Sequence, residues 1–188
     1  MSDIKLFNKW SLEDVEVTDI GLKKYISLRP IIIPHSHGRN ASQRFKKAEL
    51  NIVERFINKL MRKGRNTGKK IMVMNAVEAA FDMIYVKTGK NPVQVLVDAI
   101  QNVAPREETT RVTFGGIAQH QSVDIAPLRR VDLALRYLAQ GINSTAFNNV
   151  KSFPEIIADE LIAAANNDTK SLAIRKKQEL ERIALSAR

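Results

Sequence analysis

Apolar side chains recur at intervals of three and four residues through most of the chain beyond residue 47, a spacing that is typical of amphipathic helices. The first stripe runs from Ala48 to Met61, and we expect its helix to extend from about Ser42 to Lys63 and to stop at Gly64, a plausible C-terminal cap. Five more stripes, bounded by proline, glycine or capping residues, predict further helices. These lie within residues 69–88, 92–104, 128–142, 152–164 and 169–188. The chain is therefore expected to be mainly α-helical, with six helices.

Residues 105–127 do not follow the helical spacing. They place threonine, valine and polar residues at strand-like positions, and Gly115-Gly116 lies near the middle. Two successive glycines supply the positive φ angles that a hairpin turn needs. We therefore predict a two-stranded β-ribbon, with about 107–114 paired to 117–125. Its numerous polar side chains indicate that it protrudes from the body as an arm.

The N-terminal part shows no clear periodicity. Residues 29–43 (RPIIIPHSHGRNASQ) hold two prolines, a glycine and several turn-forming residues, and are expected to be a loop. We interpret residues 1–41 as an N-terminal extension and basic loop, followed by a helical domain over 42–188 that carries the arm at about 107–125. The residues expected to pack the extension onto the body are Trp10, Leu12, Val15 and Val17.

Positive charge is concentrated in one segment. The formal net charge of the chain is +10, and residues 29–70 alone carry twelve Lys and Arg against two Asp and Glu. The densest run, NKLMRKGRNTGKK at 58–70, contains six basic residues and no acidic one. Such a cluster repels itself unless a polyanion neutralises it, and nucleic acid is the commonest such partner. An anionic membrane surface is the competing explanation.

The GRNTGKK segment invites comparison with a nucleotide-binding P-loop. That loop needs four residues between its glycines and a Ser or Thr after the lysine. Here three residues separate Gly64 from Gly68, and Lys70 stands where the hydroxyl is required. A nucleotidase site is therefore not expected. Binding of a nucleic-acid backbone is favoured over the alternative, a merely solvated turn.

Basic residues elsewhere extend the predicted surface. Arg129 and Arg130 open the fourth helix although the helix dipole favours acidic residues there, so an external anion is expected to neutralise them. Another basic triplet lies on the last helix. The candidate RNA-binding residues are Arg39, Arg44, Lys46, Lys47, Arg62, Lys63, Arg65, Lys69, Lys70, Arg129, Arg130, Arg175, Lys176 and Lys177.

No catalytic or metal-binding constellation is visible in the sequence. There is no cysteine, and therefore no disulfide or thiolate site. His35 and His37 lie two residues apart and His120 is distant, a pattern that does not predict a metal site. The adjacent carboxylates have no evident partners for acid–base catalysis. We expect no enzymatic activity, no cofactor and no metal.

No apolar run approaches the ~20 residues that span a bilayer, and the start of the chain, MSDIKLFNKW, does not read as a signal peptide. A cytoplasmic protein without a membrane partner is therefore expected.

Three classes of function remain to be separated. Basic residues spread over a loop, several helix ends and a ribbon suit irregular folded RNA better than a single groove-reading helix would. A DNA-binding or architectural protein is the alternative, although no sharp helix-turn-helix signal is present. A nucleic-acid enzyme would need a metal or a convergent acid–base set, and neither is seen in the sequence.

An ordered series of longer motifs is similar to one known family. It consists of PHSHGRNASQRFKKAELNIVERFINKLM, GRNTGKK, TGKNPVQVLVDAIQNVAPRE, VDIAPLRRVDLALRYL, IADELIAAANN and AIRKKQELERIALSAR. The chain resembles the small-subunit ribosomal protein seven family in its archaeal and eukaryotic form. The starting segment DIKLFNKW resembles an extension that bacterial members lack. The family fold, a helical domain with a β-ribbon arm, agrees with the prediction above.

This resemblance implies a structural protein that binds small-subunit ribosomal RNA and organises its 3′ major domain, which forms the head. It also implies that the arm, with Arg111, Gly115 and Gly116, lies near the exit-site transfer RNA and the messenger exit channel. Small-subunit protein eleven and other proteins of the head are the implied protein neighbours. The resemblance carries the role of ribosomal RNA contact to Arg39, Arg44, Lys46, Lys47, Arg62, Arg65, Lys69, Lys70, Arg129 and Arg130.

Overall fold

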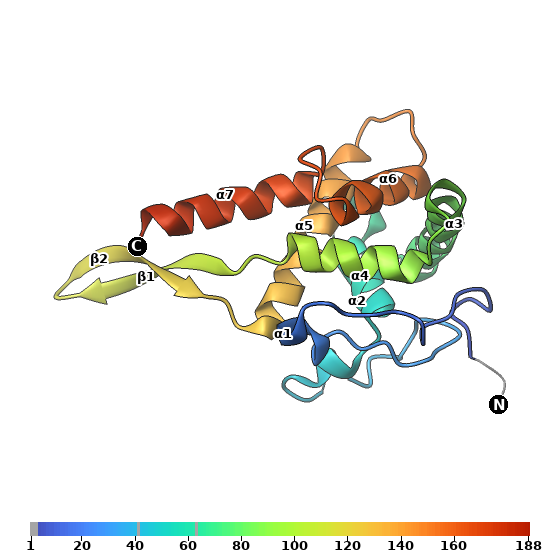
Figure 1. Cartoon of the computed structure of the whole chain (residues 1–188), viewed down its shortest axis with the longest axis horizontal. Helices are drawn as coiled ribbons and strands as arrows, with labels where there is room; N and C mark the ends of the chain where they lie inside the picture. The colour runs from blue at the N-terminus through green and yellow to red at the C-terminus, as the bar shows by residue number, and fades with distance from the viewer. Residues whose placement is uncertain (1–3, 41, 63) are drawn as a thin grey trace.

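A helical body, a projecting ribbon and an N-terminal segment wrapped along the body make up the computed structural model of the chain (Figure 1). The structure describes residues 4–40, 42–62 and 64–188. Its α-helices are α1 (Ile20–Lys23), α2 (Ile52–Leu60), α3 (Lys70–Thr88), α4 (Pro92–Val103), α5 (Pro127–Thr145), α6 (Phe153–Ala165) and α7 (Leu172–Ser186). Two short 3-10 helices are η1 (Lys46–Glu49) and η2 (Gly64–Asn66), and the strands are β1 (Glu107–Phe114) and β2 (Ile117–Asp124). The predicted fold class is confirmed.

One hydrophobic core connects the helices. The α4 helix packs against α3, α5, α6 and α7, while α2 packs mainly against α5. Phe56 of α2 and Phe81 of α3 are the largest fully buried side chains, and aliphatic residues fill the rest of the interior. The apolar stripes of the sequence thus face one another, as their spacing predicts. None of the helices in the described ranges is both long enough and apolar enough to cross a bilayer.

The prediction for the first helix is wrong at both ends. In place of one helix over 42–63, the chain forms η1, leaves helical geometry, and then starts α2 at Ile52. Asn51 is the reason: its side chain accepts the N–H of Val53 as an N-cap and donates to the Arg29 carbonyl. Upstream, Phe45 has a left-handed backbone (φ 65°), which an α-helix cannot contain. The α2 helix ends at Leu60, so Gly64 does not cap it.

The other helix boundaries follow their local signals. Asn91 caps α4 and Pro92 is its first residue. Ser152 and Glu155 form a capping box at the start of α6. Gly89 ends α3 in the left-handed conformation that favours glycine. The last helix starts three residues after the expected Thr169, because Ser171 is its N-cap.

The ribbon is confirmed with its predicted register. Strands β1 and β2 pair antiparallel from Glu107–Asp124 to Phe114–Ile117. Gly115 and Gly116 make the turn at φ 58° and 85°. The ribbon leaves the body beside α7, whose C-terminal end lies against the ribbon's base (Figure 1). There the Ser122 N–H donates to the Ala187 carbonyl, so the chain end braces the arm.

The N-terminal extension is part of the folded body. Leu12 and Val15 are buried as expected, and Trp10 and Val17 pack partly buried against the same core. Side chains of α4 hold its backbone: Gln94 accepts from Glu16 N–H and Gln101 from Asp19 N–H. The four-residue helix α1 lies in this extension and was not predicted, whereas the six longer helices match the six expected ones.

Candidate nucleic-acid interface

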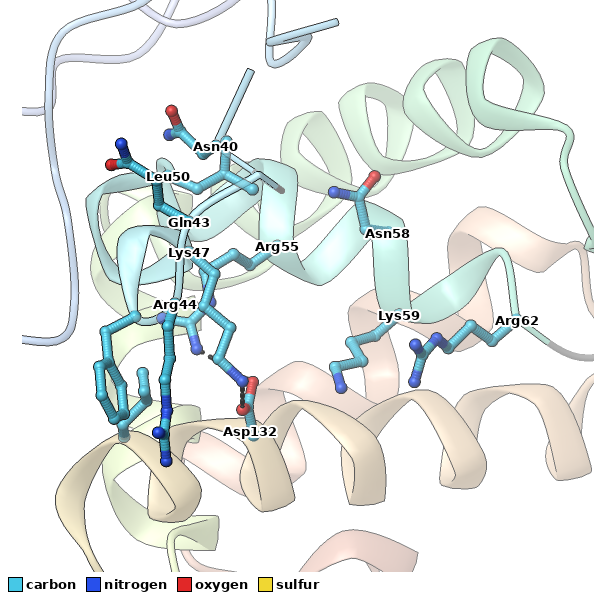
Figure 2. A pocket seen from close by; sticks show the side chains of 12 residues that line it. Asn40, Gln43, Arg44, Lys47, Leu50, Arg55, Asn58, Lys59, Arg62 and Asp132 are labelled. Carbon is cyan, nitrogen blue, oxygen red and sulfur yellow. Dashed lines mark hydrogen bonds and ion pairs between the residues drawn. The ribbon is translucent and has the colours of Figure 1, made fainter. Parts of the chain in front are cut away.

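A cavity of about 660 Å³ lies between the η1 region, α2 and the start of α5 (Figure 2). Loop, 3-10 and helix residues that are distant in sequence meet here. Among the lining residues, five are basic and one is acidic. They are Arg44, Lys47, Arg55, Lys59, Arg62 and Asp132. The cavity is therefore a strongly cationic recess.

Asp132 of α5 neutralises two of these cations. Lys47 donates to one of its carboxylate oxygens, and Arg55 donates to the other at 3.1 Å. Arg55 is almost fully buried and also donates to the Tyr25 carbonyl at 2.8 Å. Burial would raise the pKa of Asp132, but Lys47, Arg55 and Lys59 together lower it below its ordinary value. Lys47 and Arg55 are thus structural cations that already have a partner.

Lys59 is a half-buried cation of the recess with several positive neighbours. Its side chain is half-buried and forms no ion pair with a described residue. Burial lowers its pKa, Asp132 opposes this, and Arg62, Arg136 and Lys47 lower it further. Figure 2 shows Lys59 and Arg62 next to each other over α5. A further anion between them would relieve this repulsion.

Glu54 organises the neighbouring part of the basic segment. This carboxylate is only 3% exposed and accepts from Ser36 N–H, the Ser36 hydroxyl and Lys70 Nζ, the last at 2.6 Å. Burial would raise the pKa of Glu54, whereas the bonds from Lys70 and Ser36 lower it. A smaller cavity of about 230 Å³ beside Glu54 shares Asn40 and Lys47 with the larger recess. The histidine loop and the start of α3 are thereby joined to the same surface.

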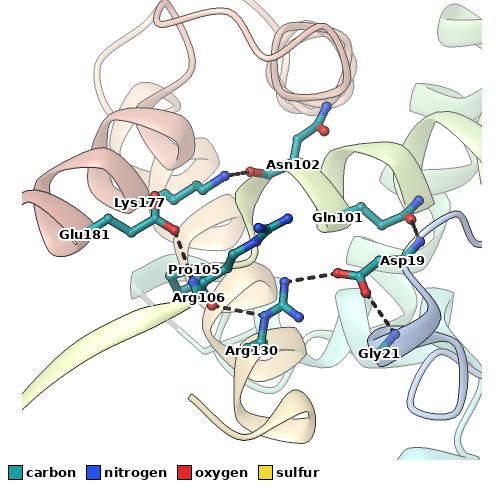
Figure 3. Close-up of polar contacts among 9 residues, drawn as sticks. All are labelled: Asp19, Gly21, Gln101, Asn102, Pro105, Arg106, Arg130, Lys177 and Glu181. Carbon is teal, nitrogen blue, oxygen red and sulfur yellow. Dashed lines mark hydrogen bonds and ion pairs between the residues drawn. The ribbon is translucent and has the colours of Figure 1, made fainter. Parts of the chain in front are cut away.

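The arginines at the start of α5 are neutralised from within the chain. Arg130 donates to Asp19 at 3.0 Å and to the Pro105 carbonyl at 3.2 Å (Figure 3). Arg129 forms a two-pronged pair with Glu108 of β1, at 2.6 and 2.8 Å. The helix-dipole argument for an external anion is therefore unnecessary, because internal carboxylates supply the negative charge.

Of the three basic residues Arg175, Lys176 and Lys177 on α7, two have partners within the chain. Lys177 donates to the Asn102 carbonyl at 2.8 Å, and Lys176 pairs with Glu179 (Figure 3 shows the first contact). Arg175 is exposed and has no ion pair with a described residue. Burial raises the pKa of Tyr137 on α5, and the positive charges of Arg136, Arg129 and Lys176 act against this rise.

Six predicted cations have neither a carboxylate partner nor a side-chain hydrogen bond to a backbone carbonyl among residues 4–40, 42–62 and 64–188. They are Arg39, Arg44, Lys46, Arg62, Lys69 and Arg175. Lys63 lies outside the described residues, and the side chain of Arg65 is not described. Arg111, Gly115 and Gly116 are exposed on the arm.

The sequence reasoning missed Arg136 as an interface candidate, and it counted Lys59 in the basic run at 58–70 without naming it as an RNA-binding residue. Lys59 and Arg136 are basic, face the same region and have no carboxylate partner among the described residues. Arg136 lies seven residues after Arg129 on one helix, a spacing that places both on one side of α5 and could have revealed it.

Cations from η1, α2, α5 and α7, carried on a helical body with a projecting ribbon, define a class: a polyanion-binding protein whose contacts span several elements. The profile of the ribosomal protein S7p/S5e family matches residues 22–188. The chain is also 51% identical over 194 residues to the small ribosomal subunit protein uS7 of Cenarchaeum symbiosum (strain A), an alignment that covers 99% of this chain and 98% of that protein. The chain therefore belongs to the ribosomal protein S7p/S5e family of small-subunit ribosomal proteins.

This membership confirms the resemblance seen in the sequence. The family makes the chain a structural ribosomal protein that binds ribosomal RNA in a ribonucleoprotein and serves translation. The alignment with the archaeal relative covers almost the whole chain, so it includes the extension that precedes the matched profile.

Proposed function

We propose that the chain is a structural component of the small ribosomal subunit in the cytoplasm, where it binds the 3′ major domain of the ribosomal RNA and organises the head. Family membership over most of the chain is the observation that carries this proposal. The bound polyanion is ribosomal RNA, with no membrane partner and no catalytic role.

The distribution of unpaired charge supports an RNA partner. In the recess, Arg44, Lys59 and Arg62 have no carboxylate partner among the residues that the structure describes, although Asp132 pairs with the neighbouring Lys47 and Arg55. Phosphate groups supply the missing negative charge, and their binding releases counterions from the RNA. Contacts that span several elements suit a junction of RNA helices better than a single groove.

The arm supports the second part of the proposal. Its base is held by the Arg129–Glu108 pair and by the chain end, while its turn lies far from the helical body (Figure 1). A firmly held base and a projecting tip suit an arm that contacts a neighbouring molecule. We place the arm, with Arg111 and the Gly115-Gly116 turn, near the exit-site transfer RNA and the messenger exit channel. Small-subunit protein eleven is the proposed protein neighbour there, with other proteins of the head around the body.

Binding to RNA fragments tests this function. The purified chain is titrated with a transcript of the 3′ major domain, a central-domain transcript of equal length and a DNA duplex of equal charge, all at the same salt concentration. The proposal predicts tightest binding to the 3′ major domain, by at least about tenfold, or ~1.4 kcal/mol.

Equal affinity for the two transcripts would contradict the assignment to the head. Tighter binding to the duplex would favour the alternative of a DNA-binding or architectural protein.

A further inference from the structure

The cationic recess combines free cations with an exposed aromatic ring. Of its five basic side chains, Lys47 and Arg55 are bound by Asp132, whereas Arg44, Lys59 and Arg62 have no carboxylate partner among the described residues. Lys59 and Arg62 lie side by side at one end (Figure 2). This end is suited to a single phosphate group, which can accept several charge-assisted hydrogen bonds.

At the other end, Arg44 and Phe45 form a cation–π pair, called the Arg44–Phe45 platform below. The Arg44 guanidinium lies over the Phe45 ring at 5.0 Å, and the ring is 61% exposed although it lines the cavity. Phe45 makes the left-handed turn (φ 65°) into η1. Aromatic rings and guanidinium planes are the two surfaces on which protein-bound bases stack.

Neutral amides also line the cavity. Asn40, Gln43 and Asn58 contribute side-chain amides, and Leu50 and Leu128 contribute apolar surface. An amide offers both a donor and an acceptor, as the edge of a nucleobase does. The volume of about 660 Å³ is within the ~300–1,000 Å³ of pockets that enclose small ligands.

We propose that this recess holds one unpaired nucleotide of the bound RNA, with the base stacked on the Arg44–Phe45 platform and the phosphate between Lys59 and Arg62. The inference rests on the proposed function, because it assigns a subsite to the RNA-binding surface. An acidic peptide of a neighbouring protein would satisfy the cations, but it would leave the aromatic platform and the amides without a role. A nucleotide uses all three kinds of group.

The test uses the full chain and a hexanucleotide of uridines with 2-aminopurine at one central position, whose fluorescence falls when the base stacks. Wild-type protein should quench it. Phe45→Ala should weaken binding about 5- to 150-fold and remove the quenching, because stacking on an aromatic side chain contributes that much per base. Phe45→Tyr should restore both. Phe147→Ala removes another exposed ring (80% exposed), outside the recess, and should change neither.

Salt dependence separates the two ends of the recess. Phe45→Ala removes no charge and should leave the slope of log affinity against log salt unchanged. Arg62→Ala should reduce that slope by about 0.7, the value of one lost phosphate contact on a single strand. Circular dichroism and thermal melting confirm that each variant is folded.

Wild-type quenching that persists in Phe45→Ala would overturn the proposal, as would absence of quenching by the wild-type protein. If the protein binds inorganic phosphate but does not quench the fluorescence of the hexanucleotide, the recess is a simple anion site. An oligoglutamate peptide that binds wild-type and Phe45→Ala protein equally, and displaces the hexanucleotide, would assign it to a protein partner. If Phe45→Ala binds the 3′ major domain as tightly as wild type, this subsite fails while the proposed function stands; if wild type does not bind that transcript, both fail.

Discussion

Glu54 shows how one buried carboxylate can hold a basic segment together. It receives hydrogen bonds from Ser36 and Lys70, which lie on opposite sides of α2 in the sequence. Lys70 is only 18% exposed in this pair. The cation therefore stabilises the fold, and its neighbour Lys69 is the exposed member of the Lys69-Lys70 pair.

This arrangement predicts a pH dependence of stability. The pKa of Glu54 in the folded chain is lower than its ordinary value of 4.5, so its contribution is present above that pH and is lost as the pH falls through the lower value. The free energy of unfolding of the wild type should therefore fall more steeply between about pH 5 and pH 3 than that of Glu54→Gln. Urea denaturation across this range measures the difference. Glu13→Gln, at an exposed site, should behave like wild type; equal slopes for wild type and Glu54→Gln would contradict the role of this carboxylate.

Phe56 tests the core at the same scale. It is fully buried on α2, so Phe56→Ala should reduce the free energy of unfolding by ~3–5 kcal/mol. Phe147→Ala is a matched control at an exposed position, where substitutions usually change stability by no more than about 0.5 kcal/mol. Chemical denaturation of both variants decides the question, and a cost below ~1 kcal/mol for Phe56→Ala would remove it from the core.

Among the elements, the start of α5 joins three parts of the chain. Arg130 is 13% exposed and connects α5 to Asp19 of the extension and to the Pro105 carbonyl before the arm (Figure 3). Arg130→Ala should lower stability by about 2 kcal/mol, because the Asp19 Oδ2 atom and the Pro105 carbonyl both lose the arginine as donor. Arg111→Ala removes an arginine from the exposed arm and serves as the control. Equal melting temperatures for the two variants would show that this junction is not structural.

The arm itself is expected to be dispensable for folding. Its two strands pair mainly with each other, and only the base touches α7. Replacing residues 109–123 by a Gly-Gly link should therefore retain cooperative thermal unfolding with a modest loss in melting temperature. Loss of cooperativity would instead make the ribbon a part of the core.

Local signals were sufficient to predict most elements. Proline at the first helical position, the Ser152–Glu155 box and the Gly115-Gly116 turn each act over a few residues, and the structure follows them. The prediction of the first helix was wrong because apolar residues continue at helical spacing on both sides of Asn51, which caps α2 and so interrupts the helix. Asn51 with Glu54 three residues later, before an apolar run, is itself a helix-start pattern that was available in the sequence.

The interface was less predictable because charge pairing is a tertiary property. The sequence indicates which residues are basic, but Asp132, Asp19, Glu108 and Glu54 reach their partners across 16 to 111 positions of the chain. Those partners distinguish structural cations from free ones. For the same reason the half-burial of Lys59, a member of the basic run at 58–70, became visible only in the fold.

At the scale of the whole molecule, Arg44, Lys59 and Arg62 line one recess, and Arg136 of α5 acts electrostatically on Lys59. Further along α5, Tyr137 lies within electrostatic range of Arg129 and Lys176, but these two cations are already paired with Glu108 and Glu179. Charges that concentrate in one region without internal partners favour association with a polyanion. Residues 1–28 of the extension hold four Lys against five Asp and Glu, so they add no net positive charge.

The most direct test of this account is the salt dependence of binding to the 3′ major domain transcript for two variants that lose the same charge. One carries Arg39→Ala, Arg44→Ala, Arg62→Ala and Lys69→Ala; the other carries Lys5→Ala, Lys23→Ala, Lys24→Ala and Lys90→Ala, none of which lines the recess. The account predicts that the slope of log affinity against log salt falls by about 3 in the first variant, at ~0.7–0.9 per phosphate contact, and stays near the wild-type value in the second. Equal slopes in the two variants would mean that only total charge matters and that the surface described above is not the RNA-binding face.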